Sequence, residues 1–73
     1  MDELSSIEKA AHLAQARKQW QYGAYQAQVD DRLAKILNDD NMKQAANANL
    51  RRALMAMDEI DKMLAEIEKG FSR

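Results

Sequence analysis

The chain has 73 residues and contains no cysteine, no proline and only two glycines. Without cysteine it forms no disulfide, and its one histidine leaves no Cys/His set that could hold a structural zinc ion. A domain of this size buries only about 60% of the surface that its unfolded chain exposes. We therefore expect one small domain, residues 1–73, that is completed by a partner chain or by self-association. The lack of cysteine also fits a reducing compartment.

Neither sign of charge dominates, and long apolar runs are lacking. Eleven Lys and Arg residues stand against twelve Asp and Glu residues, for a formal net charge of -1. This balance favours neither nucleic acid nor an anionic membrane as a partner. The acidic residues 1–9 lack the apolar region of a secretory signal, and no run is long enough to span a membrane. We expect a cytoplasmic protein that binds neither nucleic acid nor membrane.

Groups that could carry catalysis or hold a metal are not brought together by any motif. His12 has only Glu8 at helical spacing, whereas a metal site needs further converging ligands. Residues 39–40 lack the ligand spacing of a calcium loop. No glycine-rich phosphate loop and no nucleophile with an oriented base is present. We expect no enzymatic activity, no cofactor and no metal.

What is present is a composition rich in the helix formers Ala, Gln, Leu, Met, Lys and Glu. Ser5 and Glu8 have the spacing of a capping box, in which each side chain bonds the other residue's backbone N–H, so a helix is predicted to start there. The polar residues 38–41 predict a turn, because Asn and Asp side chains compete with helical hydrogen bonds. The sequence thus predicts an all-α antiparallel helical hairpin.

The second helix is predicted to be capped by Asn41 with Gln44. Gly70, free to adopt a left-handed conformation, is predicted to end it. The helical regions are therefore expected at residues 5–38 and 41–69.

Apolar residues of the second helix recur with the alternating three- and four-residue spacing of a heptad repeat. They are Ala46, Leu50, Ala53, Met57, Ile60, Leu64, Ile67 and Phe71. We expect this seam to pack against the first helix, with Leu50, Ile60, Leu64 and Ile67 holding the hairpin together.

The first helical region carries two apolar stripes. The stripe with the larger side chains is interrupted only by Lys18, and it is predicted to face the seam of the second helix. Its members are Leu4, Ile7, Ala11, Ala14, Tyr22, Tyr25, Val29, Leu33 and Ile36.

The second stripe lies on the opposite side and is made mainly of alanines, with a break at Asp31. It holds Leu13, Ala16, Trp20, Ala24, Ala27 and Ala34. A single partner helix does not cover both stripes, and tryptophan is a large apolar side chain to leave in water. The sequence therefore predicts a protein-binding surface formed by Leu13, Ala16, Trp20, Ala24 and Ala27.

Gly23 leaves two arrangements open. A glycine inside a helix costs about 1 kcal/mol relative to alanine, so the chain could break there into a three-helix arrangement that buries both stripes. Alternatively the helix continues through Gly23, with at most a kink, because the apolar stripe keeps its phase across it.

In these features the chain resembles the small co-chaperones of bacterial type III secretion, the YscE/SsaE/EscE family. The resemblance covers most of the length and lies in the opening Leu4-x-x-Ile7-Glu8, the Ala- and Gln-rich first helix and the short polar turn. It continues in the last helix, from residue 42 through Leu50 to Leu64.

The resemblance implies a function. Members of that family bind a larger tetratricopeptide-repeat chaperone, and the pair keeps the needle subunit monomeric in the cytoplasm until export. The alternative that the periodicity itself allows is a homodimeric four-helix bundle with a structural or regulatory role.

Overall fold

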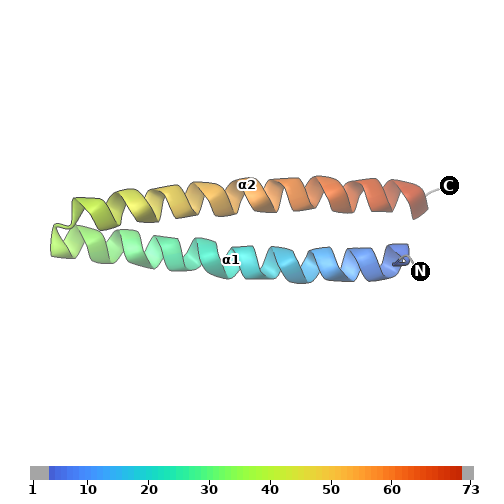
Figure 1. Cartoon of the computed structure of the whole chain (residues 1–73), viewed down its shortest axis with the longest axis horizontal. Coiled ribbons are helices and arrows are strands. Elements are labelled where there is room, and N and C mark those ends of the chain that lie inside the picture. The colour runs from blue at the N-terminus through green and yellow to red at the C-terminus, as the bar shows by residue number, and fades with distance from the viewer. Residues whose placement is uncertain (1–3, 72–73) are drawn as a thin grey trace.

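The computed structural model describes residues 4–70 and the backbone of Phe71. Two helices of 32 residues each, α1 (Ser6–Leu37) and α2 (Asp40–Phe71), lie side by side and antiparallel. The hairpin is 54 Å long. The start of α1 lies beside the end of α2, at the opposite end of the molecule from the turn (Figure 1). The predicted all-α helical hairpin is confirmed.

The start of α1 is fixed by the predicted capping box. The backbone N–H of Glu8 donates to Ser5 Oγ at 3.1 Å, and the backbone N–H of Ser5 donates to Glu8 Oε1 at 3.3 Å. These two bonds satisfy N–H groups that the first turn of a helix otherwise leaves free.

The turn between the helices is tighter than predicted. Asn38 adopts the left-handed conformation, with φ 54°, and the N–H of Asp39 donates to the carbonyl of Ala34 at 2.9 Å. Asn tolerates this conformation better than most residues, and the geometry satisfies the last carbonyls of α1. Asp39 then caps α2, since its Oδ1 accepts from the N–H of Met42 at 3.0 Å. The predicted cap at Asn41 is therefore wrong by two residues.

Both glycines are helical. α1 runs unbroken through Gly23, so the three-helix alternative does not apply. Among the described residues no glycine has a positive φ, and α2 continues through Gly70 to Phe71. The predicted helix end at Gly70 is wrong because the glycine does not take the left-handed conformation that would end the helix.

The face of α2 that packs inward is the predicted heptad seam. Ala46, Ala53, Met57 and Ile60 are buried, and Leu50, Leu64 and Ile67 are half-buried. The predicted seam position of the Phe71 side chain lies outside the described residues.

The face of α1 that packs inward is the opposite of the predicted one. Ala24, Ala27 and Ala34 are buried, and Ala24 packs against Ala53 and Met57 of α2. The stripe with the larger side chains faces away from α2. The prediction that this stripe fills the hairpin is therefore wrong.

The alanine-rich face of α1 packs against α2 because its residues repeat with the same period as the seam of α2. The inward residues of α1 repeat every seven residues with three- and four-residue spacings, as do those of α2, so both stay in register along a left-handed pair of helices. We call these residues the inner seam: Ala10, Leu13, Arg17, Trp20, Ala24, Ala27, Asp31 and Ala34. Small side chains in this seam also allow the two helices to approach closely.

Two charged residues of the inner seam, Arg17 and Asp31, form ion pairs at its edges. Arg17 reaches across to α2, where its Nε and Nη2 donate to the two carboxylate oxygens of Asp61 at 2.7 and 3.3 Å. Asp31 Oδ2 pairs with Lys35 Nζ at 3.1 Å on the same helix. The Arg17–Asp61 pair raises the pKa of Arg17, first through the hydrogen bond and second through the negative charge of Asp61.

Candidate protein-binding surface

The apolar stripe that α2 leaves uncovered is the most prominent surface of the hairpin. Ile7, Tyr22, Tyr25 and Ile36 expose 72%, 64%, 68% and 71% of their surface. We call the whole set the outer stripe: Leu4, Ile7, Ala11, Ala14, Lys18, Tyr22, Tyr25, Val29, Leu33 and Ile36. Single exposed apolar residues are normal, but a continuous row of them marks an interaction surface.

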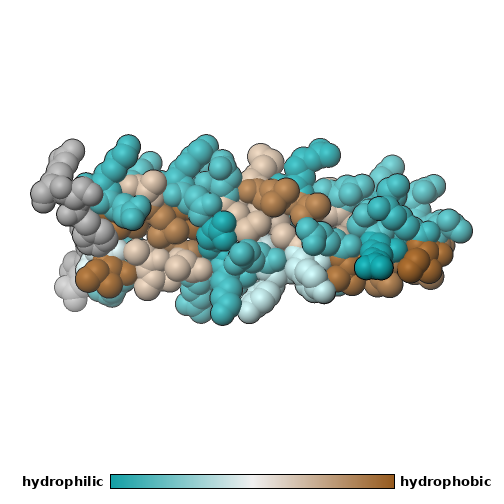
Figure 2. All heavy atoms as spheres, turned by 180° about the vertical axis from the view of Figure 1, so that it is seen from behind, coloured by the Kyte–Doolittle hydropathy of each residue, from teal (hydrophilic) through white to brown (hydrophobic). Residues whose placement is uncertain are grey.

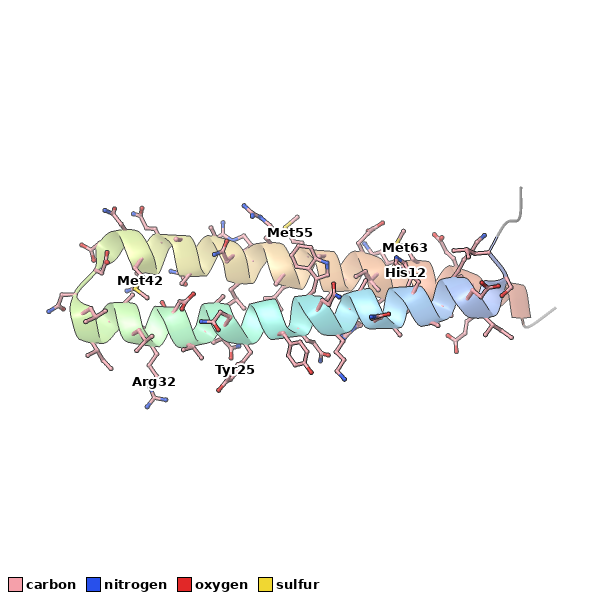
Figure 3. The ribbon with its side chains drawn as sticks, turned by 60° about the horizontal axis from the view of Figure 1, so that its bottom comes forward. His12, Tyr25, Arg32, Met42, Met55 and Met63 are labelled. Carbon is pink, nitrogen blue, oxygen red and sulfur yellow. The ribbon has the colours of Figure 1, made fainter. Side chains whose placement is uncertain are left out.

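Figure 3 shows the orientation of one member of this stripe, Tyr25. Tyr25 and Arg32 project from α1 on the side away from α2 (Figure 3). The space-filling view shows hydrophobic residues reaching the surface in several places along the hairpin, separated by hydrophilic ones (Figure 2). The outer face of α1 is thus available to another molecule.

The outer stripe follows an eleven-residue repeat. Ile7, Ala11 and Ala14 are followed at the same spacing by Lys18, Tyr22 and Tyr25, and then by Val29, Leu33 and Ile36. Repeats of seven and eleven residues drift in opposite directions around a straight helix, by about 20° per repeat, so the two faces diverge by about 150° along the 32 residues of α1. A helix that follows the outer stripe therefore crosses α1 with the opposite hand to α2.

Charge is distributed unevenly around this surface. Residues 9–29 of α1 contain no Asp or Glu, and Lys18 lies within the outer stripe. Arg17 pairs with Asp61, Lys35 with Asp31 and Lys62 with Asp58, and none of these ion pairs involves Lys18. The outer stripe is therefore apolar with a cation, Lys18, near its centre, and Arg32 projects on the same side of α1 closer to the turn (Figure 3).

The five residues predicted to bind a partner lie on the other side, toward α2. Ala27 is only 2% exposed and Ala24 is buried, so α2 covers both of them. Leu13 and Ala16 are half-buried. The expectation that this face is free is wrong for the two buried alanines, and a partner contact by the other three residues stays a prediction.

Trp20 is 38% exposed, because the indole is too large for the space between the helices. It lines a shallow groove of about 300 Å³ with Gly23 and Ala27 of α1 and Asn49 and Arg52 of α2. A second groove of about 300 Å³ lies at the open end, where Leu4, Leu13, Met63 and Ile67 meet. Both grooves adjoin the hairpin interface, and Leu4, in the second groove, also belongs to the outer stripe.

The described residues contain no cluster of His, Cys, Asp or Glu side chains that could hold a metal ion. In residues 4–71 neither helix includes a stretch hydrophobic enough for a membrane span. No protein-family model, no curated protein and no solved structure matches the chain.

Proposed function

We propose that this protein is a small, non-enzymatic cytoplasmic co-chaperone that acts by binding another protein through the outer stripe of α1. In this proposal the partner is a tetratricopeptide-repeat chaperone of a bacterial type III secretion system. The pair helps to keep a needle subunit monomeric before export. The helical hairpin is consistent with this role, and the sequence resemblance supplies the identity of the partner.

The observation that carries the proposal is the exposure of large apolar side chains. Tyr22, Tyr25 and Ile36 expose about two thirds of their surface, although smaller residues of the same helix, Ala24, Ala27 and Ala34, are buried. Covering such side chains is favourable by roughly 25 cal/mol per Å² of apolar surface removed from water. A helical chaperone whose own apolar surface needs covering is a suitable partner for this stripe.

The proposal is tested by isolating the tagged chain from its source cell and identifying the proteins that accompany it. We expect a helical-repeat chaperone together with a needle subunit. Tyr25→Glu should abolish their recovery, because it places a charge in the middle of the apolar contact. Met55→Glu on α2 is the matched control, since Met55 is also 68% exposed but lies outside the outer stripe.

The two parts of the proposal fail separately. Equal recovery with both variants would show that the outer stripe is not the docking surface. Recovery of a partner unrelated to secretion, lost only with Tyr25→Glu, would refute the secretion role and retain the surface.

A further inference from the structure

Within the outer stripe, small residues on one side of the aromatic pair correspond to larger residues on the other side. Ala11 and Ala14 follow Ile7 in the N-terminal part, while Val29 and Leu33 precede Ile36 in the part near the turn. The two aromatic residues lie between them. We infer that the outer stripe pairs with the outer stripe of a second copy of this chain, antiparallel, about a two-fold axis near Tyr22.

The spacing of the stripe matches this register from Ile7 to Ile36, and Leu4 lies beyond the paired part. In an antiparallel pair centred near Tyr22, Ile7 faces Ile36 of the second copy. Ala11 and Ala14 face the larger Leu33 and Val29, so that side chains of unequal size meet at these two levels. Such alternation of large and small residues lets two helices interdigitate. A parallel pair would instead place alanine against alanine and leave a gap.

The same register gives Lys18 an aromatic neighbour. Lys18 lies opposite Tyr25 of the second copy, where the ammonium group can lie over the aromatic ring. Tyr22 lies near the axis, opposite its own copy, and aromatic pairs of this kind add to the burial of apolar area. In a parallel pair Lys18 would face Lys18, with no carboxylate between residues 9 and 29 to neutralise either of them.

The available area is sufficient for a weak dimer. The exposed tyrosines and aliphatic residues of one stripe offer on the order of 500 Å², or about 1,000 Å² for the two copies, the lower limit for a specific interface. Because the interface of this dimer is small, a partner protein that covers the outer stripe more fully would displace the second copy. The self-pairing does not depend on the proposed co-chaperone role, and its failure would leave that role standing.

Sedimentation of the pure chain over a range of concentrations is the first test. A reversible monomer–dimer equilibrium is expected, and a chain that remains monomeric up to about 1 mM overturns the inference. Lys18→Glu should raise the dimer dissociation constant about tenfold, since two symmetric contacts with Tyr25 are lost. Arg51→Glu, at an exposed site on α2, is the control and should leave the constant unchanged.

Cross-linking then tests the register. The chain has no cysteine, so single cysteines can be introduced without background. Tyr22→Cys should form covalent dimers with a short bis-maleimide. Ile36→Cys alone should not, because its two copies lie about 43 Å apart along the helices, but it should cross-link when mixed with Ile7→Cys. Efficient self-cross-linking of Ile36→Cys would show a parallel pair and overturn the antiparallel arrangement.

Binding of the pure chain to vesicles of anionic lipid tests whether the outer stripe binds a membrane instead of a second copy. A membrane would also accept an apolar helix face with a basic residue. We expect no binding, because the net charge is -1 and the flanks of the stripe are rich in glutamine. Vesicle binding that is lost with Tyr25→Glu, together with a monomeric chain in solution, would assign the stripe to the membrane instead.

Discussion

The two long faces of α1 differ in both the size and the period of their residues. The inner seam consists mainly of alanines that repeat every seven residues, whereas the outer stripe carries the tyrosines and most of the branched aliphatic residues with an eleven-residue repeat. The less hydrophobic face is nevertheless the one that packs against α2. The comparison indicates that matching periods decide which faces of two long helices stay together. Total hydrophobicity is secondary.

The largest difference in the free energy of unfolding is expected between two isoleucine-to-alanine substitutions, one in the buried seam of α2 and one in the outer stripe of α1. Ile60→Ala removes a buried side chain of the α2 seam and should lower the free energy of unfolding by about 2 kcal/mol or more. Ile36→Ala, in the outer stripe, should change it by less than about 0.5 kcal/mol. Urea denaturation at low protein concentration, followed by circular dichroism, measures both. Equal losses would contradict the assignment of the two faces.

A smaller change of opposite sign is expected at Gly23. A methyl group added there meets no atom within 4 Å, and the backbone is helical. Gly23→Ala should therefore raise the free energy of unfolding by about 1 kcal/mol. Gly70→Ala is equally unhindered but lies in the last turn of α2, so it should have less effect. A destabilised Gly23→Ala variant would indicate that α1 bends at this residue.

The smallest effect is expected from the ion pair at the edge of the inner seam. Arg17→Gln should lower the melting temperature slightly, and the difference should shrink in about 1 M salt, which screens exposed charges. Because the pKa of Arg17 is raised, its contribution is present below the ordinary pKa of arginine and is lost only as the pH rises through the raised value. The difference between the two proteins should thus be the same at about pH 6 and pH 9. A difference that grows toward pH 9 would contradict this.

Much of the fold could be predicted from local sequence signals. The Ser5–Glu8 capping box, the polar turn and the α2 seam each depend on residues close together in the chain, and the structure contains all three. The i,i+4 pair of Asp58 and Lys62 also forms, at 3.3 Å. The cap at Asp39 cannot be predicted from the sequence, because Asp39, Asp40 and Asn41 are all able to cap a helix and only the left-handed conformation of Asn38 selects Asp39.

The candidate surface could be predicted only in part. The sequence shows that the outer stripe is apolar, but the larger size of its side chains predicts, wrongly, that it packs inside the hairpin. The signal that identifies the inner seam is its spacing, which stays regular even though Arg17, Trp20 and Asp31 are unusual seam residues. Arg17 is acceptable there because Asp61 lies across from it on α2, a contact between residues 44 positions apart. Such a contact cannot be read from either helix separately.

The most direct test of the account is the accessibility of the two faces of α1 to a thiol reagent. With no native cysteine, Tyr25→Cys and Ala27→Cys each report on one position, two residues apart and on different faces. At low protein concentration we expect Tyr25→Cys to react as fast as an unfolded control. Ala27→Cys should react at least about tenfold more slowly, because the hairpin must open first. Fast reaction at position 27 with protection at position 25 would contradict the account.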